Sequence, residues 1–381
     1  MRNPPKSSSR KKRNSLEAKD KKYLWHPFTQ MRDWEKEEVT IIESGRGAWL
    51  RDTKGRRYLD GVSSLWCNVH GHRVPALDRA LRKQLSKIAH STFLGLSNVP
   101  AILLAEKLIQ IAPQGLTRVF YSDSGSEAVE IALKMAFQYW QQRGFKNKKK
   151  FARLTHAYHG DTLGSVSVGG IDLFHQIYKP LLFESFGVPS PYRYRWPTGS
   201  DPERVKKESL EAMEKVLARH HEQMAAFVME PLMQGAAGMI DQPPGYISRA
   251  RELTKKYNVL LIFDEVATGF GRTGTLFASD QEKVTPDLLA VAKGMTGGYL
   301  PLAATLATEE IYRAFLGRYE NFKTFFHGHT YTANPLASNV ALANLRLFEK
   351  DRVLEALQPK IQRFRKRLQD FYDLSSVGDV R

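Results

Sequence analysis

Residues 259–274 read VLLIFDEVATGFGRTG, and this stretch decides the fold class. Five consecutive apolar residues, Val259 to Phe263, run directly into two acidic residues, Asp264 and Glu265. A short, uninterrupted apolar run is typical of a strand that is buried on both faces of a sheet. A carboxylate at the end of such a strand is costly to bury unless it meets a positive partner. The stretch therefore predicts a buried parallel strand that ends in a functional site.

Similar apolar runs lie on both sides of this strand in the sequence. They alternate with helical patterns such as Glu127 to Trp140, where apolar residues recur at helical spacing. This alternation predicts an α/β fold with a mainly parallel sheet, whose ligands bind at the carboxyl ends of the strands. The other predicted strands are RVFYS (118–122), ARLT (152–155), AAFVMEP (225–231), LLAVAKG (288–294) and LAATLAT (302–308).

The composition excludes several classes of protein. The chain has 381 residues, 42% of them hydrophobic, with 20 Phe, 15 Tyr and 6 Trp, which is enough for a large packed core. Cys67 is the one cysteine, so a disulfide scaffold and a cysteine-clustered zinc or iron–sulfur site are excluded. No apolar run approaches the roughly 20 residues of a membrane span. We expect a cytoplasmic protein with no membrane partner.

The formal net charge is +17, and it is unevenly distributed. Residues 1–24 contain nine Lys or Arg against Glu17 and Asp20, and they lack the apolar segment of a signal peptide. We expect these residues to form a basic, disordered tail. A second basic stretch, KNKKKFAR (146–153), lacks the interleaved aromatic residues of a nucleic-acid-binding surface. We therefore expect solvated surfaces and no nucleic acid partner.

One candidate site follows another predicted strand. Residues 122–127, SDSGSE, stand directly at the start of the predicted helix. The free N–H groups and the positive end of the dipole at such a start suit a phosphate, and Gly125 and Ser126 are the candidate contacts. An ordinary helix cap is the alternative, because Ser and Asp favour that position in any helix.

Two further strand ends bear chemically interesting residues. Lys293 closes an apolar strand, and a buried lysine has a lowered pKa and becomes a nucleophile for carbonyl carbons. The alternative is a lysine that simply reaches solvent. Tyr158, in HAYHGDT (156–162), can stack on a planar ring or can simply pack on the core. The histidine pairs match no metal-binding motif, so we expect no metal site; these pairs are His70/His72, His156/His159 and His327/His329.

Residues 269–274, GFGRTG, match the glycine pattern of a dinucleotide-binding turn. That turn must open a helix, but the following TLFASDQEKVTPD has no clear helical face and contains Pro286. The preceding acidic pair would also repel a pyrophosphate. These glycines are therefore predicted to shape a loop.

The combination of these features is more specific than any one of them. Asp264 precedes Lys293 by 29 residues, and each follows a buried strand. A phosphate-binding turn, a stacking aromatic ring, a carboxylate for a ring nitrogen and a Schiff-base lysine are the parts of a pyridoxal 5'-phosphate site. The sequence therefore predicts this cofactor.

With these motifs, residues 25–381 resemble the class III (subgroup II) pyridoxal-phosphate-dependent aminotransferases. DEVATGFGRTG followed by AKG is the most specific part of the signature. The resemblance is greatest to the members that aminate 8-amino-7-oxononanoate in biotin biosynthesis. It extends over WHPFTQM (25–31), LDGVSSLWCNVHGH (59–72), SDSGSEAVEIALKMAFQYW (122–140), YHGDTLG (158–164) and HGHTYTANPLA (327–337).

The resemblance implies fold type I and a homodimer with active sites at the subunit interface. It places a large cofactor-binding domain, with a mainly parallel seven-stranded sheet, at residues 76–335. A smaller α/β domain would be built from residues 25–75 and from residues 336–381. Family members continue past the position of Arg381 and contribute an arginine that binds the substrate carboxylate. The C-terminal part of the small domain is therefore expected to be incomplete here.

The resemblance also implies roles for individual residues. Lys293 would form the Schiff base and then move the proton, and Asp264 would pair with the ring nitrogen. Gly125 and Ser126 would bind the phosphate, and Tyr158 would flank the ring. Further implied contacts are the ring edge for Glu230 and Gln234, the phosphate across the interface for His329 and Thr330, and the substrate for Phe28, Leu65, Trp66 and Gly328.

Two departures from the family pattern bear on the donor and on activity. Members that use S-adenosylmethionine have a Tyr where Phe28 stands and a Trp where Leu65 stands, so contact with a sulfonium would be weaker here. Lysine is therefore slightly favoured as the amino donor, and S-adenosylmethionine stays open. The alternatives are another class III aminotransferase, acting on an ω-amino acid or a diamine, and a catalytically silent relative that lacks the C-terminal arginine.

Overall fold

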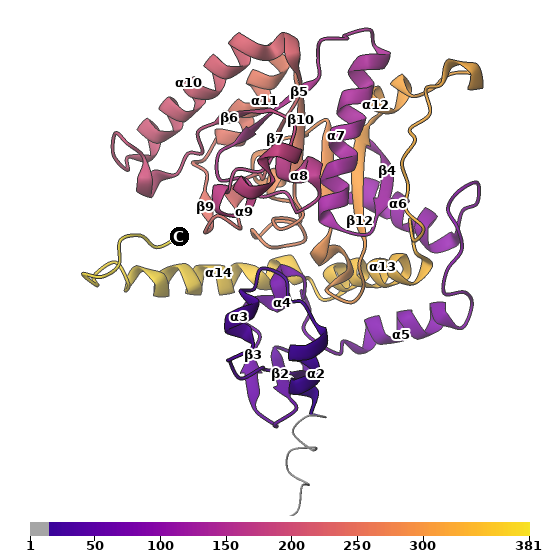
Figure 1. Ribbon diagram of the computed structural model, residues 1–381, viewed down its shortest axis with the longest axis vertical. Coiled ribbons are helices and arrows are strands. Elements are labelled where there is room, and N and C mark those ends of the chain that lie inside the picture. The colour runs from indigo at the N-terminus through magenta and orange to yellow at the C-terminus, as the bar shows by residue number, and fades with distance from the viewer. Residues whose placement is uncertain (1–14) are drawn as a thin grey trace, which may run out of the picture. The chain divides into compact units, whose positions relative to one another are not determined.

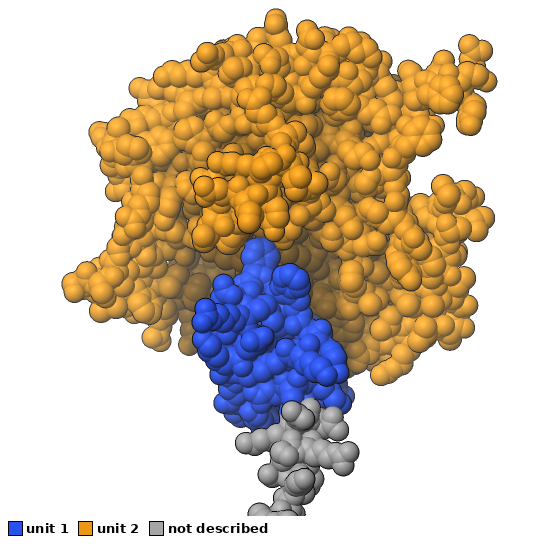
Figure 2. Space-filling view, viewed as in Figure 1, with its two compact units in different colours: residues 1–64, 70–74 blue, residues 65–69, 75–381 orange. Residues whose placement is uncertain are grey.

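The structure is a computed structural model that describes residues 15–381, and the chain divides into two units (Figure 2). The smaller unit takes the chain up to residue 64 together with residues 70–74. The larger unit consists of residues 65–69 and 75–381, so it includes residues 336–381. The predicted small domain formed from both ends of the chain stays a prediction.

The smaller unit contains a three-stranded antiparallel sheet in the order β1-β2-β3. Its helix α2 lies within residues 1–24, which the sequence predicts to be a disordered tail. That prediction is wrong for residues 15–24, and residues 1–14 lie outside the described part of the chain. The elements are α2 (Leu16–Tyr23), α3 (Met31–Trp34), β1 (Ile42–Arg46), β2 (Trp49–Asp52) and β3 (Arg57–Leu59).

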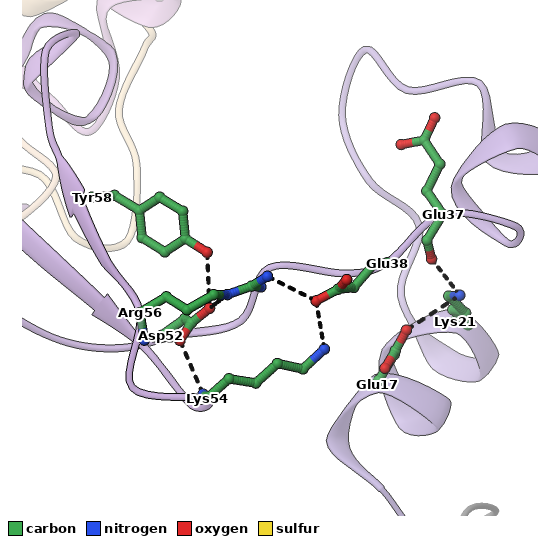
Figure 3. A network of polar contacts seen from close by, with 8 residues as sticks. All are labelled: Glu17, Lys21, Glu37, Glu38, Asp52, Lys54, Arg56 and Tyr58. Atoms are coloured by element: carbon green, nitrogen blue, oxygen red, sulfur yellow. Dashed lines mark hydrogen bonds and ion pairs between the residues drawn. The ribbon is translucent and has the colours of Figure 1, made fainter.

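Helix α2 forms because its ends are satisfied and because it is tethered. The Ser15 side chain accepts a hydrogen bond from the N–H of Ala18 (3.1 Å), which caps the first turn. Lys21, in the last turn, donates to the carbonyl oxygen of Glu37 (2.6 Å) (Figure 3). The composition of residues 15–24 indicates only a charged, solvated stretch and does not predict the contact between Lys21 and Glu37.

Asp52 organises the turn between β2 and β3 (Figure 3). Its carboxylate accepts hydrogen bonds from the N–H groups of Lys54 (3.0 Å) and Arg56 (2.8 Å), from Nε of Arg56 (2.7 Å) and from the hydroxyl of Tyr58 (2.9 Å). Burial alone would raise the pKa of Asp52, but the hydrogen bonds outweigh it and lower the pKa to about 2. The ionised carboxylate therefore fixes the hairpin.

The larger unit is built on a seven-stranded sheet in the order β4-β12-β11-β10-β7-β5-β6. Strand β12 runs antiparallel to both of its neighbours, and the other strands all point the same way, which confirms the predicted mainly parallel sheet. All six predicted strands are present, and β6 is one that the sequence did not predict. The strands are β4 (Leu116–Ser122), β5 (Lys150–Leu154), β6 (Ser185–Val188), β7 (Met224–Met229), β10 (Leu260–Asp264), β11 (Leu288–Val291) and β12 (Ala303–Thr308).

Helices bury both faces of this sheet (Figure 1). In β10, Leu260 and Ile262 belong to the core that includes the buried side of α7, whereas Leu261 and Phe263 belong to the core on the opposite face. Successive residues of a strand point to opposite faces, so a sheet covered on both sides needs an unbroken apolar run. This explains why the strands show no alternation of polar and apolar residues.

Helix α7 (Gly125–Gln142) begins and ends within two residues of the helix predicted from Glu127 to Trp140. Among residues 15–381, no helix is both long and apolar enough to cross a membrane. The longer helices are α5 (Pro75–Leu85), α6 (Val99–Ile111), α7 (Gly125–Gln142), α10 (Pro202–His220), α11 (Tyr246–Lys256), α13 (Pro335–Lys350) and α14 (Val353–Gln369), and the shorter ones include α8 (Leu163–Ser167) and α12 (Glu309–Ala314).

The glycines of residues 269–274 shape a loop, as predicted. No helix opens within this stretch, and Phe270, Gly271 and Gly274 have positive φ angles of 53°, 86° and 102°. Such angles suit turns and interrupt regular helices. The loop therefore lacks the strand–turn–helix geometry of a dinucleotide-binding fingerprint.

Candidate active site

Three ionisable residues lie at the carboxyl ends of three adjacent strands. Glu230 directly follows β7, Asp264 ends β10, and Lys293 follows the end of β11. Asp264 and Glu230 are buried, and Lys293 is half-buried. The parallel strands thus gather two carboxyl groups and one amine at the edge of the sheet where α/β folds bind their ligands.

Lys293 lies in a backbone conformation that few lysines adopt. Its φ angle is 45°, in the left-handed region, and Nζ lies 4.7 Å from the ring centre of Trp66. Burial lowers the pKa of Lys293, against the opposing effect of the Asp264 and Glu230 carboxyl groups. A lysine of this kind loses its proton more readily than an exposed one, so it can act as a nucleophile or as a base.

Both oxygens of Asp264 are held by donors. Oδ1 accepts a hydrogen bond from the N–H of Val266 (3.0 Å), and Oδ2 lies 2.7 Å from Nδ1 of His159. The His159 side chain is 0% exposed. The sequence analysis considered His159 only as half of a histidine pair and did not predict its contact with Asp264. The one sequence feature that could have indicated a role in the site is its position next to Tyr158 in YHGDTLG.

Glu230 is held by two backbone N–H groups. Its carboxylate accepts hydrogen bonds from Gly235 (2.9 Å) and from Tyr158 (3.3 Å). Burial raises the pKa of Glu230 to about 7, and the nearby Asp264 carboxylate adds to this effect. Gln234, expected beside Glu230, is fully buried, and its Nε2 donates to the carbonyl oxygen of Thr155 (2.9 Å).

Tyr158 reaches into the same region from the loop after β5. Its N–H is the donor to Glu230, and its hydroxyl donates to the Asp161 carboxylate (2.8 Å). Burial raises the pKa of Tyr158, and the hydrogen bond to Asp161 raises it further. The phenol therefore stays protonated and presents a neutral ring that can flank a flat ligand.

The start of α7 lies beside these strand ends and is closely packed. A Cβ atom on Gly125 would lie 2.5 Å from Cγ1 of Val266, so only glycine fits there without a shift. Ser126 Oγ accepts a hydrogen bond from the N–H of Thr162 (3.0 Å) and lies 3.0 Å from its hydroxyl. Gly160 approaches Ser126 so closely that an added Cβ would lie 2.3 Å from it. The result is a glycine-lined helix start of the kind that binds phosphate.

His329 also lies near the start of α7. Its Nδ1 is 3.7 Å from the Glu127 carboxylate and 3.9 Å from that of Asp123. These three side chains could each offer one atom to a metal ion, and the expected absence of a metal site stays a prediction. Thr330 and Gly328 are exposed, and an added Cβ on Gly328 would meet no atom within 4 Å.

The expected substrate contacts divide between the two units. Phe28 belongs to the smaller unit and is exposed there. Leu65 and Trp66 belong to the larger unit, and Leu65 is exposed whereas the Trp66 ring lies under Lys293. Residues 63–66 all have positive φ angles, between 47° and 69°. Consecutive left-handed residues other than glycine are strained, so the backbone departs from its preferred conformation where it delivers Trp66 to the site.

A known protein family matches most of the chain. The family described as aminotransferase class-III matches residues 31–381. An adenosylmethionine-8-amino-7-oxononanoate aminotransferase of Aquifex aeolicus is 56% identical over 368 residues, which cover 96% of this chain and 81% of that protein. A protein of the same name from Staphylococcus aureus is 51% identical, with the same coverage of both chains.

Solved structures agree in fold. The crystal structure of the adenosylmethionine-8-amino-7-oxononanoate aminotransferase of Methanocaldococcus jannaschii matches with a TM-score of 0.91 and 48% identity, covering 96% of this chain and 82% of that one. An ω-transaminase of Pseudomonas jessenii, solved in complex with PMP, matches with a TM-score of 0.92 and 33% identity over the same shares of the two chains.

These matches confirm the predicted fold type I and the resemblance drawn from the motifs. They extend over both units of the chain and include every strand of the seven-stranded sheet. The chain therefore belongs to the class III aminotransferases, a family of pyridoxal-phosphate-dependent enzymes that transfer an amino group between small molecules.

Proposed function

We propose that the chain aminates 8-amino-7-oxononanoate to 7,8-diaminononanoate, a step of biotin biosynthesis. The observation that carries the proposal is the 56% identity, over 96% of the chain, with a relative named for this reaction. The buried Asp264 and Glu230 and the adjacent Lys293 support a working site rather than a catalytically silent one.

The described residues fit pyridoxal 5'-phosphate, which supplies an electron sink for the carbanion formed at the donor carbon. Lys293 would hold the cofactor carbonyl through Nζ, and its lowered pKa leaves an amine that can take up and return a proton. Asp264 would face the ring nitrogen, and Tyr158 would flank the ring. Because one lysine both removes and returns the proton, the site needs no second base.

The start of α7 would hold the phosphate. Its backbone N–H groups and positive dipole end favour a dianion, and Gly125 lets the backbone approach closely. The Ser126 hydroxyl is already oriented by Thr162. Glu230, with a pKa raised to about 7, would stand near the ring edge together with Gln234.

The proposal includes a homodimer whose sites form at the interface. Residues 319–331 expose several large rings next to His329 and Thr330, and exposed apolar side chains gathered on one segment are typical of a contact surface. These side chains are Tyr319, Phe322, Phe326 and Tyr331. Sedimentation velocity of the chain and of Phe326→Asp tests this: the wild type should sediment as a dimer, and the variant should shift toward monomer.

Two amino donors are compatible with the proposal. S-adenosylmethionine stands in the names of the relatives. Lysine is favoured slightly by Phe28 and Leu65, which remove a hydroxyl group and an aromatic surface that a sulfonium would contact. The proposal also places the enzyme in the cytoplasm, where the single thiol of Cys67 suits a reducing environment.

A second candidate function is the transamination of an ω-amino acid or a diamine. It is favoured by the TM-score of 0.92 with the ω-transaminase of Pseudomonas jessenii. The lower sequence identity of that protein, 33% against 56%, makes this the runner-up.

A visible absorbance titration with pyridoxal 5'-phosphate tests the proposal. A band should form with the wild type and not with Lys293→Ala. Lysine or S-adenosylmethionine should then bleach the band, and the one that does so is the donor. Adding 8-amino-7-oxononanoate should restore the band, whereas restoration only by an ω-keto compound would favour the runner-up. A band that forms equally well in Lys293→Ala would contradict the assignment of the cofactor site.

A further inference from the structure

His159 lies in direct contact with Asp264 and has no access to solvent. Nδ1 is 2.7 Å from Oδ2 of the carboxylate, and the side chain is 0% exposed. The other ring nitrogen, Nε2, is also buried and has no hydrogen-bond partner among residues 15–381. The contact with Asp264 is therefore the polar interaction that holds this ring.

We propose that His159 is a positioning residue that orients the Asp264 carboxylate toward the cofactor ring nitrogen. This inference rests on the proposed function, because the ring nitrogen belongs to pyridoxal 5'-phosphate. An ionised carboxylate only accepts hydrogen bonds, so Nδ1 of His159 is the donor. Together with the N–H of Val266 on Oδ1, this bond fixes the plane of the carboxylate with one donor on each oxygen.

The position of a second buried carboxyl group gives His159 a further effect. The Asp264 carboxylate is close enough to Glu230 to contribute to its raised pKa, and both groups are buried. Because Nδ1 of His159 lies against Asp264, it would fix the orientation of that carboxyl group next to the second one.

The geometry excludes a simple packing role for the ring. An apolar side chain of similar size would fill the space, but it would leave Oδ2 buried without its donor, which is costly for a carboxylate.

The charged and titratable groups around Lys293 are Asp264, Glu230, Cys67 and Arg272. Among the described residues, His159 is the side chain that donates a hydrogen bond to Asp264. Replacing His159 therefore removes this one hydrogen bond.

Two variants of His159 separate the hydrogen bond from the volume of the ring. His159→Asn places an amide N–H close to the position of Nδ1, whereas His159→Leu removes the donor. The probes are pyridoxal 5'-phosphate and its analogue in which carbon replaces the ring nitrogen. Affinity is measured by titrating the visible absorbance of the bound cofactor, and the pH midpoint of that absorbance is recorded for each variant.

We expect His159→Leu to weaken the binding of pyridoxal 5'-phosphate by about tenfold. Loss of a residue that hydrogen-bonds to a ligand-holding group has effects on this scale. The pH midpoint of the band should shift as well. His159→Asn should restore most of the affinity. The carbon analogue should bind the wild type and both variants equally, because it has no nitrogen for Asp264 to meet. In an Asp264→Asn background, His159→Leu should add little, since the two residues act through one contact.

Three results would overturn the proposal: unchanged affinity and pH midpoint in His159→Leu, an equal loss with the carbon analogue, or an undiminished loss in the Asp264→Asn background. If the leucine variant does not fold, His159→Gln gives the comparison with His159→Asn, because its amide lies one carbon farther from the backbone and does not match the position of Nδ1. A wild type that forms no band at all would contradict the proposed function, whereas a wild type with a band and insensitive His159 variants would contradict this inference alone.

Discussion

Gly125, the first residue of α7, packs directly against Val266, two residues after the end of β10. An added Cβ on Gly125 would lie 2.5 Å from Cγ1 and 2.8 Å from Cγ2 of the valine. The helix start that would hold the cofactor phosphate is thereby fixed against the strand that ends in Asp264. This contact sets the distance between the start of α7 and Asp264.

Gly125→Ala should therefore displace the helix start and weaken the binding of pyridoxal 5'-phosphate. Misplacement of a binding group by about 1 Å can cost roughly 100-fold, and we expect a loss between tenfold and that value by absorbance titration. Gly187→Ala, in β6, is the control, because its added Cβ would make only ordinary contacts at 3.8 Å. Equal affinities for the two variants would contradict the role of this packing.

Lys293→Ala should abolish the visible band and lower the rate of transamination by at least about 100-fold, because both the covalent attachment and the mobile proton are lost. Lys293→Arg should not rescue the rate, since a guanidinium keeps its proton. Lys150→Ala, which removes a partly exposed lysine paired with Glu184, should leave the rate unchanged. A Lys293→Arg enzyme with wild-type turnover would show that the amine is not the base.

Glu230 should make the apoenzyme less stable as the pH rises. Burial raises its pKa from 4.5 to about 7, so the folded state binds the proton more tightly than the unfolded state does. The free energy of unfolding then falls between these two pH values and stays low above pH 7, by about 3 kcal/mol for a shift of this size. Glu230→Gln should show a smaller decline, and the part that remains is due to Glu265, whose pKa burial also raises to about 7. Urea unfolding of both proteins at pH 5 and pH 8 measures the difference, and parallel declines would contradict the prediction.

Asp52 should stabilise the smaller unit in the opposite pH range. Its pKa is lowered from 3.8 to about 2, so its stabilising effect is fully present above pH 3.8 and is lost as the pH falls through 2. Asp52→Asn should speed amide exchange in β2 and β3 at neutral pH, because the hydrogen bonds from Arg56 and Tyr58 weaken. Glu38→Gln should change exchange little, since its ion pairs with Lys54 and Arg56 are exposed. Equal exchange rates in the two variants would argue against a special role for Asp52.

Much of the larger unit could be predicted because its strands are buried on both faces. Runs such as Val259 to Phe263 have no competing helical pattern, and the residues that follow them mark the site. Strand β6 was missed because Ser185–Val188 is short and contains Gly187, so its apolar signal is weak. Helix α2 was missed because it buries no residue and depends on contacts with later parts of the chain.

The sequence predicts which residues belong to the candidate site, but it does not predict which of them contact one another. Lys293, Asp264 and Gly125 are recognisable because each stands at a strand end or a helix start. The bond between His159 and Asp264 joins residues far apart in the sequence, and no periodicity reports such a pair. The raised pKa of Glu230 likewise follows from burial in the folded chain, which the sequence alone does not quantify.

The pairing of the antiparallel strand β12 affects the order in which the sheet can form during synthesis. Among residues 15–381, strand β4 lies at the edge of the sheet and pairs only with β12, so that Ser122 meets Ala303. During synthesis β4 leaves the ribosome long before its partner exists, and until then its backbone edge has nothing in the sheet to pair with. The helix start at Gly125 can therefore reach its final place only late in translation, when pairings distant in sequence finally close the sheet.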